Sequence, residues 1–269
     1  MDLSGKLDTV VRSDPGRVRG RNEDAVYANA SLGVAILADG MGGYNAGNVA
    51  SGMAVAMLSE HFSELLQQRS LEELESHPVQ TIDSAVCQAN EAILNAAQRQ
   101  PQYSGMGTTL VLGWFIDNRV YLAHLGDSRC YRWRAGVLQL MTRDHSLLQE
   151  QLDSGMIRPE EAKYVDYRNL VTRALGVEPV IEVEVSEHEV LPGDIFLLCS
   201  DGLNDMLADA EIATLFARHG ANLEKLAESL IEAANDYGGR DNVSVVLVGV
   251  RQSFAAPRGW WQRLLAKLK

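Results

Sequence analysis

The chain has 269 residues, of which 46% are hydrophobic, and a formal net charge of −12. Residues 251–269 hold five basic residues and no acidic one, so residues 1–250 carry −17, the total less these five positive charges. So acidic a body excludes nucleic acid as a partner, because phosphate backbones need basic surfaces. The length allows one large domain or two small ones, and the hydrophobic share allows a sizeable core. The acidity makes clustered carboxylates available to hard cations.

The sequence shows no feature of export or of a membrane span. Its N-terminus lacks a basic start followed by an apolar segment, and no run of about 18 apolar residues occurs. Cys87, Cys130 and Cys199 form no C-x-x-C pair and lie in apolar runs. They are expected to be buried thiols in a reducing compartment, which predicts a cytoplasmic protein.

The first hundred residues predict three short strands followed by two amphipathic helices. The strands are expected at 7–13, 25–27 and 34–38, and the last of them ends at a carboxylate and a tight glycine turn. Asn48 is expected to cap the first helix, whose apolar stripe runs to Leu65, and the second helix spans 81–99. Residues 67–78 read as a polar connection.

The remainder of the chain predicts antiparallel hairpins interrupted by a polar insertion. Strands are expected at 108–116, 119–125, 129–134, 137–141, 182–190, 195–199 and 243–250, with a helix at 223–234. The insertion at 142–180 predicts short helices through Asp153 and from Pro159. It is either a lid over a site or a surface excursion, and the residues alone do not choose between them.

Carboxylates recur where predicted strands begin or end. They are Glu23, Asp24, Asp39, Asp127, Asp201 and Asp241. One Asp-Gly pair is most often just a turn, but buried carboxylates brought together could not all stay ionised without a cation. Only oxygen ligands are on offer, so Mg²⁺ or Mn²⁺ is favoured over Zn²⁺ or Cu²⁺. Two such ions could clamp a phosphoryl group that Arg19 also binds.

Six short motifs, all in order, resemble those of the metal-dependent Ser/Thr protein phosphatases (PPM, or type 2C) in their bacterial form. They are Arg19-x-x-Asn22-Glu23-Asp24, Asp39-Gly40-Met41-Gly42-Gly43, Gly107-Thr108-Thr109, Gly126-Asp127-Ser128-Arg129, Ser200-Asp201-Gly202-Leu203 and Gly239-x-Asp241-Asn242-Val243-Ser244. Each motif alone is weak, and the ordered set is specific. The resemblance implies an α+β fold, a four-layer α-β-β-α sandwich of two antiparallel sheets flanked by helices. Residues 1–250 would form the phosphatase domain, with 142–180 as a flap-like insertion.

The resemblance also implies roles for single residues. Asp39 would bridge two Mn²⁺ or Mg²⁺ ions and, with Arg19, form the catalytic pair. Asp201 and Asp241 would also hold the first ion, and the Gly40 carbonyl would hold the second, on which Glu23 would act through water. Asp24 would support the site, and Asp127 would hold a third, weaker ion that Asp201 shares. Arg19 would bind the substrate phosphate, and His145 and Asn242 would be secondary residues.

The implied reaction is hydrolysis of phosphoserine or phosphothreonine by direct attack of a hydroxide bridging the two metal ions, without a phospho-enzyme. The partners would be phosphorylated proteins, including a Ser/Thr kinase or its target. Two departures from the family pattern stand out. Met41 replaces the histidine proposed as general acid in animal members, and Asp166-Tyr167 replaces the His-Pro that often precedes the bacterial flap pair, here Arg168-Asn169. For His145, a structural hydrogen-bonding role is favoured over proton donation.

The C-terminal tail, residues 251–269, is basic and amphipathic. Its segment 259–269 places two tryptophans and three leucines on one helical face, with Arg263 and Lys267 off it. This predicts contact with a partner or with an acidic membrane surface, and the second would place the protein peripherally at the inner membrane. The alternative is a helix that docks on the protein's own body.

Two rival functions remain open at this stage. A binding module that has lost catalysis would be expected to lack ligands, whereas every matched metal position holds its acid. A metal-dependent phosphoesterase acting on small molecules would use the same residues.

Overall fold

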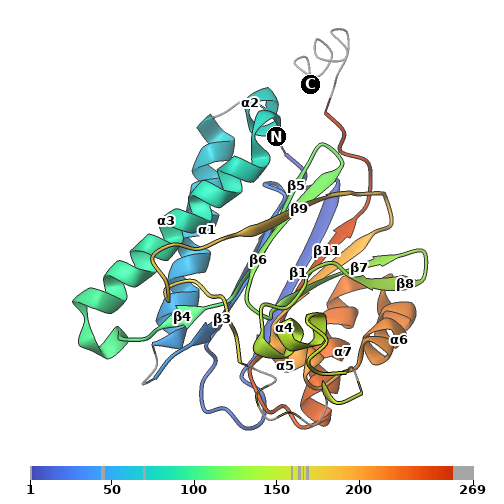
Figure 1. Cartoon of the computed structure of the whole chain (residues 1–269). Helices are drawn as coiled ribbons and strands as arrows, with labels where there is room; N and C mark the ends of the chain where they lie inside the picture. The colour runs from blue at the N-terminus through green and yellow to red at the C-terminus, as the bar shows by residue number, and fades with distance from the viewer. Residues whose placement is uncertain are drawn as a thin grey trace.

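Two antiparallel β-sheets packed face to face form the centre of the protein, described here from a computed structural model (Figure 1). The structure describes residues 2–43, 46–68, 71–158, 160–162, 165, 167 and 170–256, with the backbone alone at 71, 72 and 75. The first sheet has the order β1 (Leu7–Asp14), β11 (Val243–Val250), β10 (Ile195–Cys199), β7 (Arg129–Arg134) and β8 (Val137–Leu140). The second has the order β2 (Asp24–Asn29), β3 (Val34–Met41), β5 (Leu110–Ile116), β6 (Arg119–Leu125) and β9 (Glu184–Glu189), and β4 (Gly107–Thr108) also pairs with β3.

Helices cover the outer face of each sheet and complete four layers (Figure 1). The second sheet carries α1 (Gly47–Gln68) and α3 (Pro78–Arg99), joined by α2 (Leu71–Ser76), and the first sheet carries α6 (Asp209–His219) and α7 (Leu223–Asp236). Three apolar clusters fill the two helix–sheet interfaces and the space between the sheets. Between the sheets, Phe115 and Phe196 meet edge to face with ring centroids 5.3 Å apart. The predicted α+β sandwich is therefore confirmed.

Tight hairpins explain why neighbouring strands of the chain pair antiparallel. Asp117 and Asn118 join β5 to β6 with φ of 48° and 54°, and Ala135 and Gly136 join β7 to β8 with φ of 49° and 84°. Two consecutive left-handed residues match the right-handed twist of the strands they connect. Both turns agree with the sequence prediction.

Strand β3 differs from its prediction at the functionally important end. The expected strand 34–38 continues through Asp39 to Met41, because Gly40 and Met41 pair with Thr108 and Gly107 of β4. The expected strand 108–116 is in turn interrupted at Thr109, whose backbone N–H donates to the Asp39 carbonyl at 2.9 Å. The glycine turn therefore begins later than expected, at Gly42.

Several other predictions need correction. Asn48 does not cap α1, which already begins at Gly47, and the connection 67–78 contains α2. Cys87 is exposed, since the buried stripe of α3 runs through Val86 and the next residue is rotated by about 100°. Helices α6 and α5 (Asp201–Asn204) were not predicted, whereas the helix expected to end at Asp153 is confirmed as α4 (Leu147–Asp153). The helix start expected at Pro159 lies outside the described residues.

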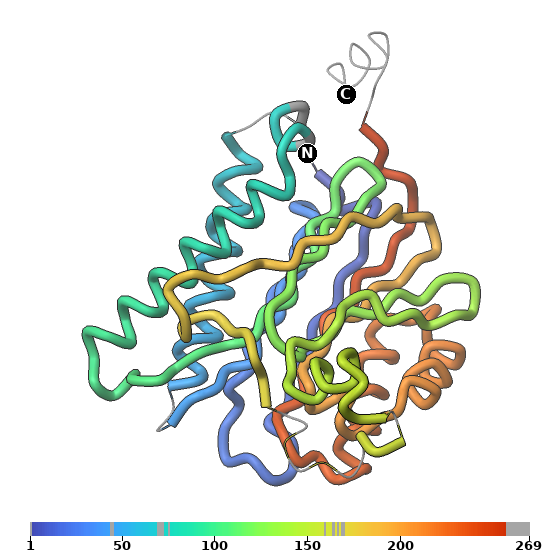
Figure 2. The backbone as a smooth tube through the Cα atoms, in the orientation of Figure 1, coloured from blue at the N-terminus to red at the C-terminus, as the bar shows by residue number. Residues whose placement is uncertain are grey.

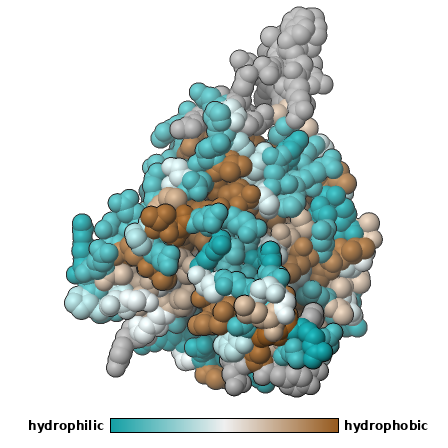
Figure 3. Space-filling view, in the orientation of Figure 1, coloured by the Kyte–Doolittle hydropathy of each residue, from teal (hydrophilic) through white to brown (hydrophobic). Residues whose placement is uncertain are grey.

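The surface mixes hydrophilic residues with small exposed hydrophobic groups (Figure 3). Within the described residues, no helix combines the length and apolar character that crossing a bilayer requires. The tail segment 259–269 lies outside the described residues, so its prediction is not tested by the structure.

Candidate metal centre and active site

A cleft of about 370 Å³ opens at one end of the two sheets. Strand ends and the loops that follow them bring its polar side chains together from distant parts of the chain. Eight of the residues predicted from the sequence line it: Arg19, Glu23, Asp39, Gly40, Asp127, Asp201, Asp241 and Asn242. Asp24 lies directly behind this set, and His145 lies to one side.

The backbone of Asp39 is held by the Gly107-Thr108-Thr109 motif. The Asp39 N–H donates to Thr109 Oγ1 at 3.0 Å, and the Thr108 hydroxyl donates to the Asp39 carbonyl at 2.8 Å. Thr109 Oγ1 also lies 2.7 Å from the Ser128 hydroxyl, beside Asp127. These threonines therefore position two acidic loops relative to each other.

Asp24 is a supporting carboxylate rather than part of the cleft wall. It opens β2 opposite Asp39 in the strand register. Its Oδ2 accepts hydrogen bonds from the hydroxyls of Ser200, at 2.9 Å, and Ser244, at 2.6 Å. Ser200 directly follows β10 and Ser244 lies in β11, so Asp24 of β2 ties the two sheets together beneath the site.

The donor set fits divalent cations that prefer oxygen. Among the described residues, the buried atoms Asp24 Oδ1 and Asp201 Oδ1 have no hydrogen-bond partner. Uncompensated buried carboxylate oxygens are costly, and a hard cation is the usual compensation. The residues that line the cleft offer carboxylates and carbonyls without a thiol, as Mn²⁺ and Mg²⁺ require.

The pKa values of the carboxylates in the cleft also favour a bound cation. Burial raises the pKa of both Asp39 and Asp201 well above the usual range, and repulsion from the surrounding carboxylates adds to each shift. Burial also raises the pKa of Asp127 to about 7, with the charge of Asp144 as the next cause. The pKa of Asp24 is raised by burial against the opposing effect of its two serine donors. The site therefore favours either protons or metal ions.

We expect the metal-free protein to lose stability as the pH rises from about 5 to about 8. The pKa values of Asp39, Asp127 and Asp201 are raised in the folded state. In this window the folded protein then binds more protons than the unfolded chain, so the free energy of unfolding falls with pH, by about 1–3 kcal/mol. Urea unfolding after EDTA treatment measures the slope.

Two controls accompany that measurement. Asp127→Asn should flatten the slope, because it removes a group whose pKa of about 7 lies inside the window. Saturating Mn²⁺ should also flatten it, because a cation favours the ionised carboxylates. A metal-free protein that becomes more stable towards pH 8 would contradict the expectation.

Asn242 fastens the loop that carries Arg19 to the loop that carries Asp241. Its Nδ2 donates to the carbonyls of Pro15, at 3.1 Å, and Arg21, at 2.8 Å, and its Oδ1 accepts from the Glu23 N–H at 2.8 Å. The Arg19 guanidinium reaches Asp241 Oδ2 at 2.7 Å, and this hydrogen bond is the main cause that raises the pKa of Arg19. Asn242 is thus a positioning residue, a more specific role than the sequence indicated.

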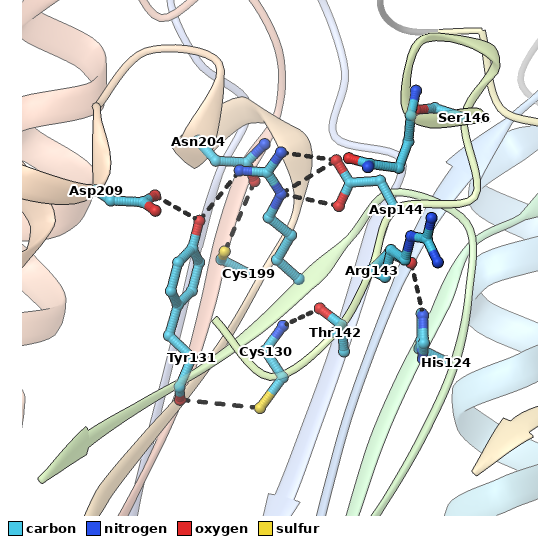
Figure 4. A network of polar contacts seen from close by, with 12 residues as sticks. His124, Cys130, Tyr131, Thr142, Arg143, Asp144, Ser146, Cys199, Asn204 and Asp209 are labelled. Carbon is cyan, nitrogen blue, oxygen red and sulfur yellow. Dashed lines mark hydrogen bonds and ion pairs between the residues drawn. The ribbon is translucent and has the colours of Figure 1, made fainter. Parts of the chain in front are cut away.

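A buried network links the Asp127 loop to the start of the insertion (Figure 4). Arg129 makes a bidentate pair with Asp144, at 2.7 and 2.9 Å, and also donates to the Tyr131 hydroxyl at 3.2 Å. That hydroxyl donates to Asp209 at 3.0 Å, at the start of α6. The sequence predicted no function for Arg129, although it belongs to one of the six motifs, or for Asp144.

The returning arm of the insertion crosses beside the cleft before it enters β9 (Figure 2). Val171 pairs with Ser146, Leu175 pairs with Thr108, and Leu170 and Val171 line the cleft. The insertion is therefore placed next to the site, as a flap would be. The pair Arg168-Asn169 and the preceding Asp166 lie outside the described residues.

His145 sits at the base of the insertion in a hydrogen-bonded cluster. Its ring stacks on His124 with centroids 4.6 Å apart, Nδ1 accepts from the Gly126 N–H at 3.3 Å, and Nε2 lies 3.3 Å from Glu184 Oε2. The ligand atoms of His124, His145 and Glu184 are close enough to hold a metal ion. However, an Nδ1 that accepts leaves the proton on Nε2, so a cation would have to displace it. These contacts agree with the structural role favoured from the sequence.

The family model that matches the chain is described as Protein phosphatase 2C and covers residues 17–243. The chain belongs to the protein phosphatase 2C family. A curated relative, the serine/threonine phosphatase stp of Listeria innocua, is 40% identical over 88% of this chain and 93% of its own length. The serine/threonine protein phosphatase PstP of Mycobacterium tuberculosis is 42% identical over 91% of this chain and 45% of its own length.

A solved structure connects the family to the predicted cofactor. The crystal structure of the catalytic domain of PstP in complex with two manganese ions has a TM-score of 0.81 and 38% identity, covering 92% of this chain and 99% of that one. The predictions of a 2C-type phosphatase, of its fold and of divalent manganese or magnesium as cofactor are confirmed. The ligand role of each residue is a separate question.

Proposed function

We propose that this 2C phosphatase hydrolyses phosphoserine and phosphothreonine in proteins and thereby reverses a Ser/Thr kinase, with the kinase or its targets as substrates. The convergence of Arg19 with Asp39, Asp127, Asp201 and Asp241 on one cleft carries the proposal. The relatives named as serine/threonine phosphatases support the substrate class.

We propose the metal ligands that the family resemblance implies, and their place in one cleft supports them. Asp39, Asp201, Asp241 and the Gly40 carbonyl would hold two divalent ions directly, Glu23 would act through water, Asp24 would support the set, and Asp127 would hold a third, weaker ion. When bound, two such ions supply an activated water and neutralise charge on the phosphoryl group. Only glycine fits at position 40, because a Cβ there would lie 2.2 Å from the Gly47 carbonyl oxygen.

Arg19 would bind the phosphoryl oxygens of the substrate. Its side chain is 55% exposed, and its hydrogen bond to Asp241 aims the guanidinium over the carboxylates. A planar guanidinium can bind two phosphate oxygens at once, which orients the ester for in-line attack.

The leaving-group oxygen would take its proton from water. Met41 lines the cleft, but a thioether has no proton to donate. Both ring nitrogens of His145 already have partners in Gly126 and Glu184. Burial is the first cause that lowers the pKa of His145, which disfavours the protonated ring. Water is therefore the donor that we propose.

The cellular setting is also proposed. All three cysteines are free thiols, which supports a reducing, cytoplasmic environment. For segment 259–269, contact with a membrane surface or a partner and docking on the protein's own body both stay predictions from the sequence.

The test is hydrolysis of a phosphothreonine peptide, of p-nitrophenyl phosphate and of sugar phosphates with Mn²⁺, with Mg²⁺ and with EDTA. We expect turnover with either metal, loss of at least about 100-fold with EDTA, and recovery when Mn²⁺ is restored. Hydrolysis of sugar phosphates without hydrolysis of the phosphopeptide would replace the proposal by a small-molecule phosphoesterase. A folded protein that is inactive with every metal would indicate a binding module.

A further inference from the structure

Three exposed arginines flank residues that line the cleft. Arg17 and Arg21 lie two residues before and after it, and Arg240 directly precedes Asp241. We call Arg17, Arg21 and Arg240 the arginine rim. All three are exposed, and none of them forms an ion pair within the part of the chain that the structure describes.

The charge balance of the protein bears on what this rim can bind. The chain has 36 acidic and 24 basic residues, so carboxylates outnumber their possible partners. Elsewhere, arginines such as Arg12, Arg134 and Arg251 pair with nearby carboxylates. Cations left unpaired in so acidic a protein are available to an anion from outside.

The backbone beneath the rim is held firmly. The Arg17 and Val18 N–H groups donate to the Gly239 carbonyl at 2.7 and 3.2 Å, and a side chain at Gly239 would come within 2.8 Å of Arg17 Cγ. Asn242 binds the Arg21 carbonyl at 2.8 Å. The two loops therefore present the three guanidinium groups from a fixed base, which lowers the entropy cost of binding an anion.

We infer that the arginine rim binds a second phosphoryl group on the same substrate segment, so that this phosphatase prefers multiply phosphorylated sequences. The inference deepens the proposed function and rests on it. Two residues span at most about 7 Å, so the spacing of Arg17 and Arg21 from Arg19 matches a second group one to three residues from the reacting one. A phosphoryl dianion suits arginine because the guanidinium fork binds two of its oxygens.

The test compares three otherwise identical phosphothreonine peptides. The first has serine two residues from the phosphothreonine, the second has a non-hydrolysable phosphonate there, and the third has aspartate. The number of reactive groups is then equal in all three. We expect kcat/KM with Mn²⁺ to be about 10-fold higher for the phosphonate peptide than for the serine peptide, an advantage that shrinks at high salt.

The variants address the rim itself. In the combined Arg17→Ala, Arg21→Ala and Arg240→Ala protein we expect the phosphonate-to-serine ratio to fall to within about twofold of unity. The ratio cancels any loss common to both peptides, and thermal melting checks that the variant folds. The single variants replace it if it does not fold. Arg218→Ala removes another exposed arginine, on α6, and should leave the ratio unchanged.

The outcomes separate this inference from the proposed function. If the wild type hydrolyses the serine peptide but shows no phosphonate advantage, or keeps the advantage without the rim, the inference is wrong and the proposed function stands. An equal gain with aspartate would overturn the assignment of a phosphoryl group. If no peptide is hydrolysed with any metal, the proposed function fails first.

Discussion

Replacing Asp39 by asparagine is expected to lower kcat for p-nitrophenyl phosphate and for a phosphothreonine peptide by at least about 10³-fold. The pKa of Asp39 is raised by burial and then by the charges of Asp24, Asp201, Asp127 and Asp241. Asp39 therefore lies among carboxylates whose repulsion a cation would relieve. Steady-state kinetics with saturating Mn²⁺ measures the loss.

The same substitution should stabilise the metal-free protein, by about 1–2 kcal/mol, because it removes one charge from a group of mutually repelling carboxylates. Urea unfolding in EDTA measures this gain. Asp236→Asn, at the exposed end of α7, is the matched control and should change neither quantity. An Asp39→Asn enzyme within about tenfold of wild type would show that Asp39 does not hold the metal ions.

Replacing Arg129 by methionine is expected to destabilise the protein by about 3 kcal/mol. Asp144, whose side chain is only 13% exposed, would lose its bidentate partner, and the Tyr131 hydroxyl would lose a donor. For a chain of this length the melting temperature should fall by roughly 6–12 °C. Calorimetry on the Mn²⁺-loaded protein measures the shift.

A second readout connects this network with the cleft. The charge of Arg129 lowers the pKa of Asp127 and that of Asp144 raises it, so the variant should raise the pKa of Asp127 above about 7 and weaken any ion held there. Arg143→Met is the control, because its ion pair with Asp153 is more exposed and should be worth less than about 1 kcal/mol. If the two variants have the same melting temperature, the Arg129–Asp144 pair does not stabilise the fold.

The ends of the strands show where prediction from sequence succeeded. Three features that depend only on neighbouring residues were predicted from their local pattern. They are the strand before Asp39, the turn at Asp117 and Asn118, and the apolar stripe of α3. The motif resemblance predicted that eight residues now found in one cleft belong to the same site. Their spacing along the sequence alone could not predict this.

The failures of prediction arose mainly where distant residues decide the structure. The continuation of β3 to Met41 depends on β4, and the hydroxyls that hold Asp24 come from Ser200 and Ser244. The contacts of Asn242 with Pro15, Arg21 and Glu23 also join the two ends of the domain. No local periodicity carries such information. The exposure of Cys87 is different, since helical geometry relative to the predicted stripe already implies it.

The place of β11 has a consequence for biosynthesis. This strand is made last of those in the two sheets, yet it lies between β1 and β10, and the residues just before it are Asp241 and Asn242. A nascent chain that ends at Arg240 already contains Asp24, Asp39 and Asp201, but the loop of Arg19 lacks its hydrogen bonds to Asp241 and Asn242, and the first sheet has a gap at its second position. Such long-range pairing must wait for the whole segment to leave the ribosome. The enzyme is therefore assembled after synthesis of its domain and cannot act on phosphoproteins near the ribosome while it is being made.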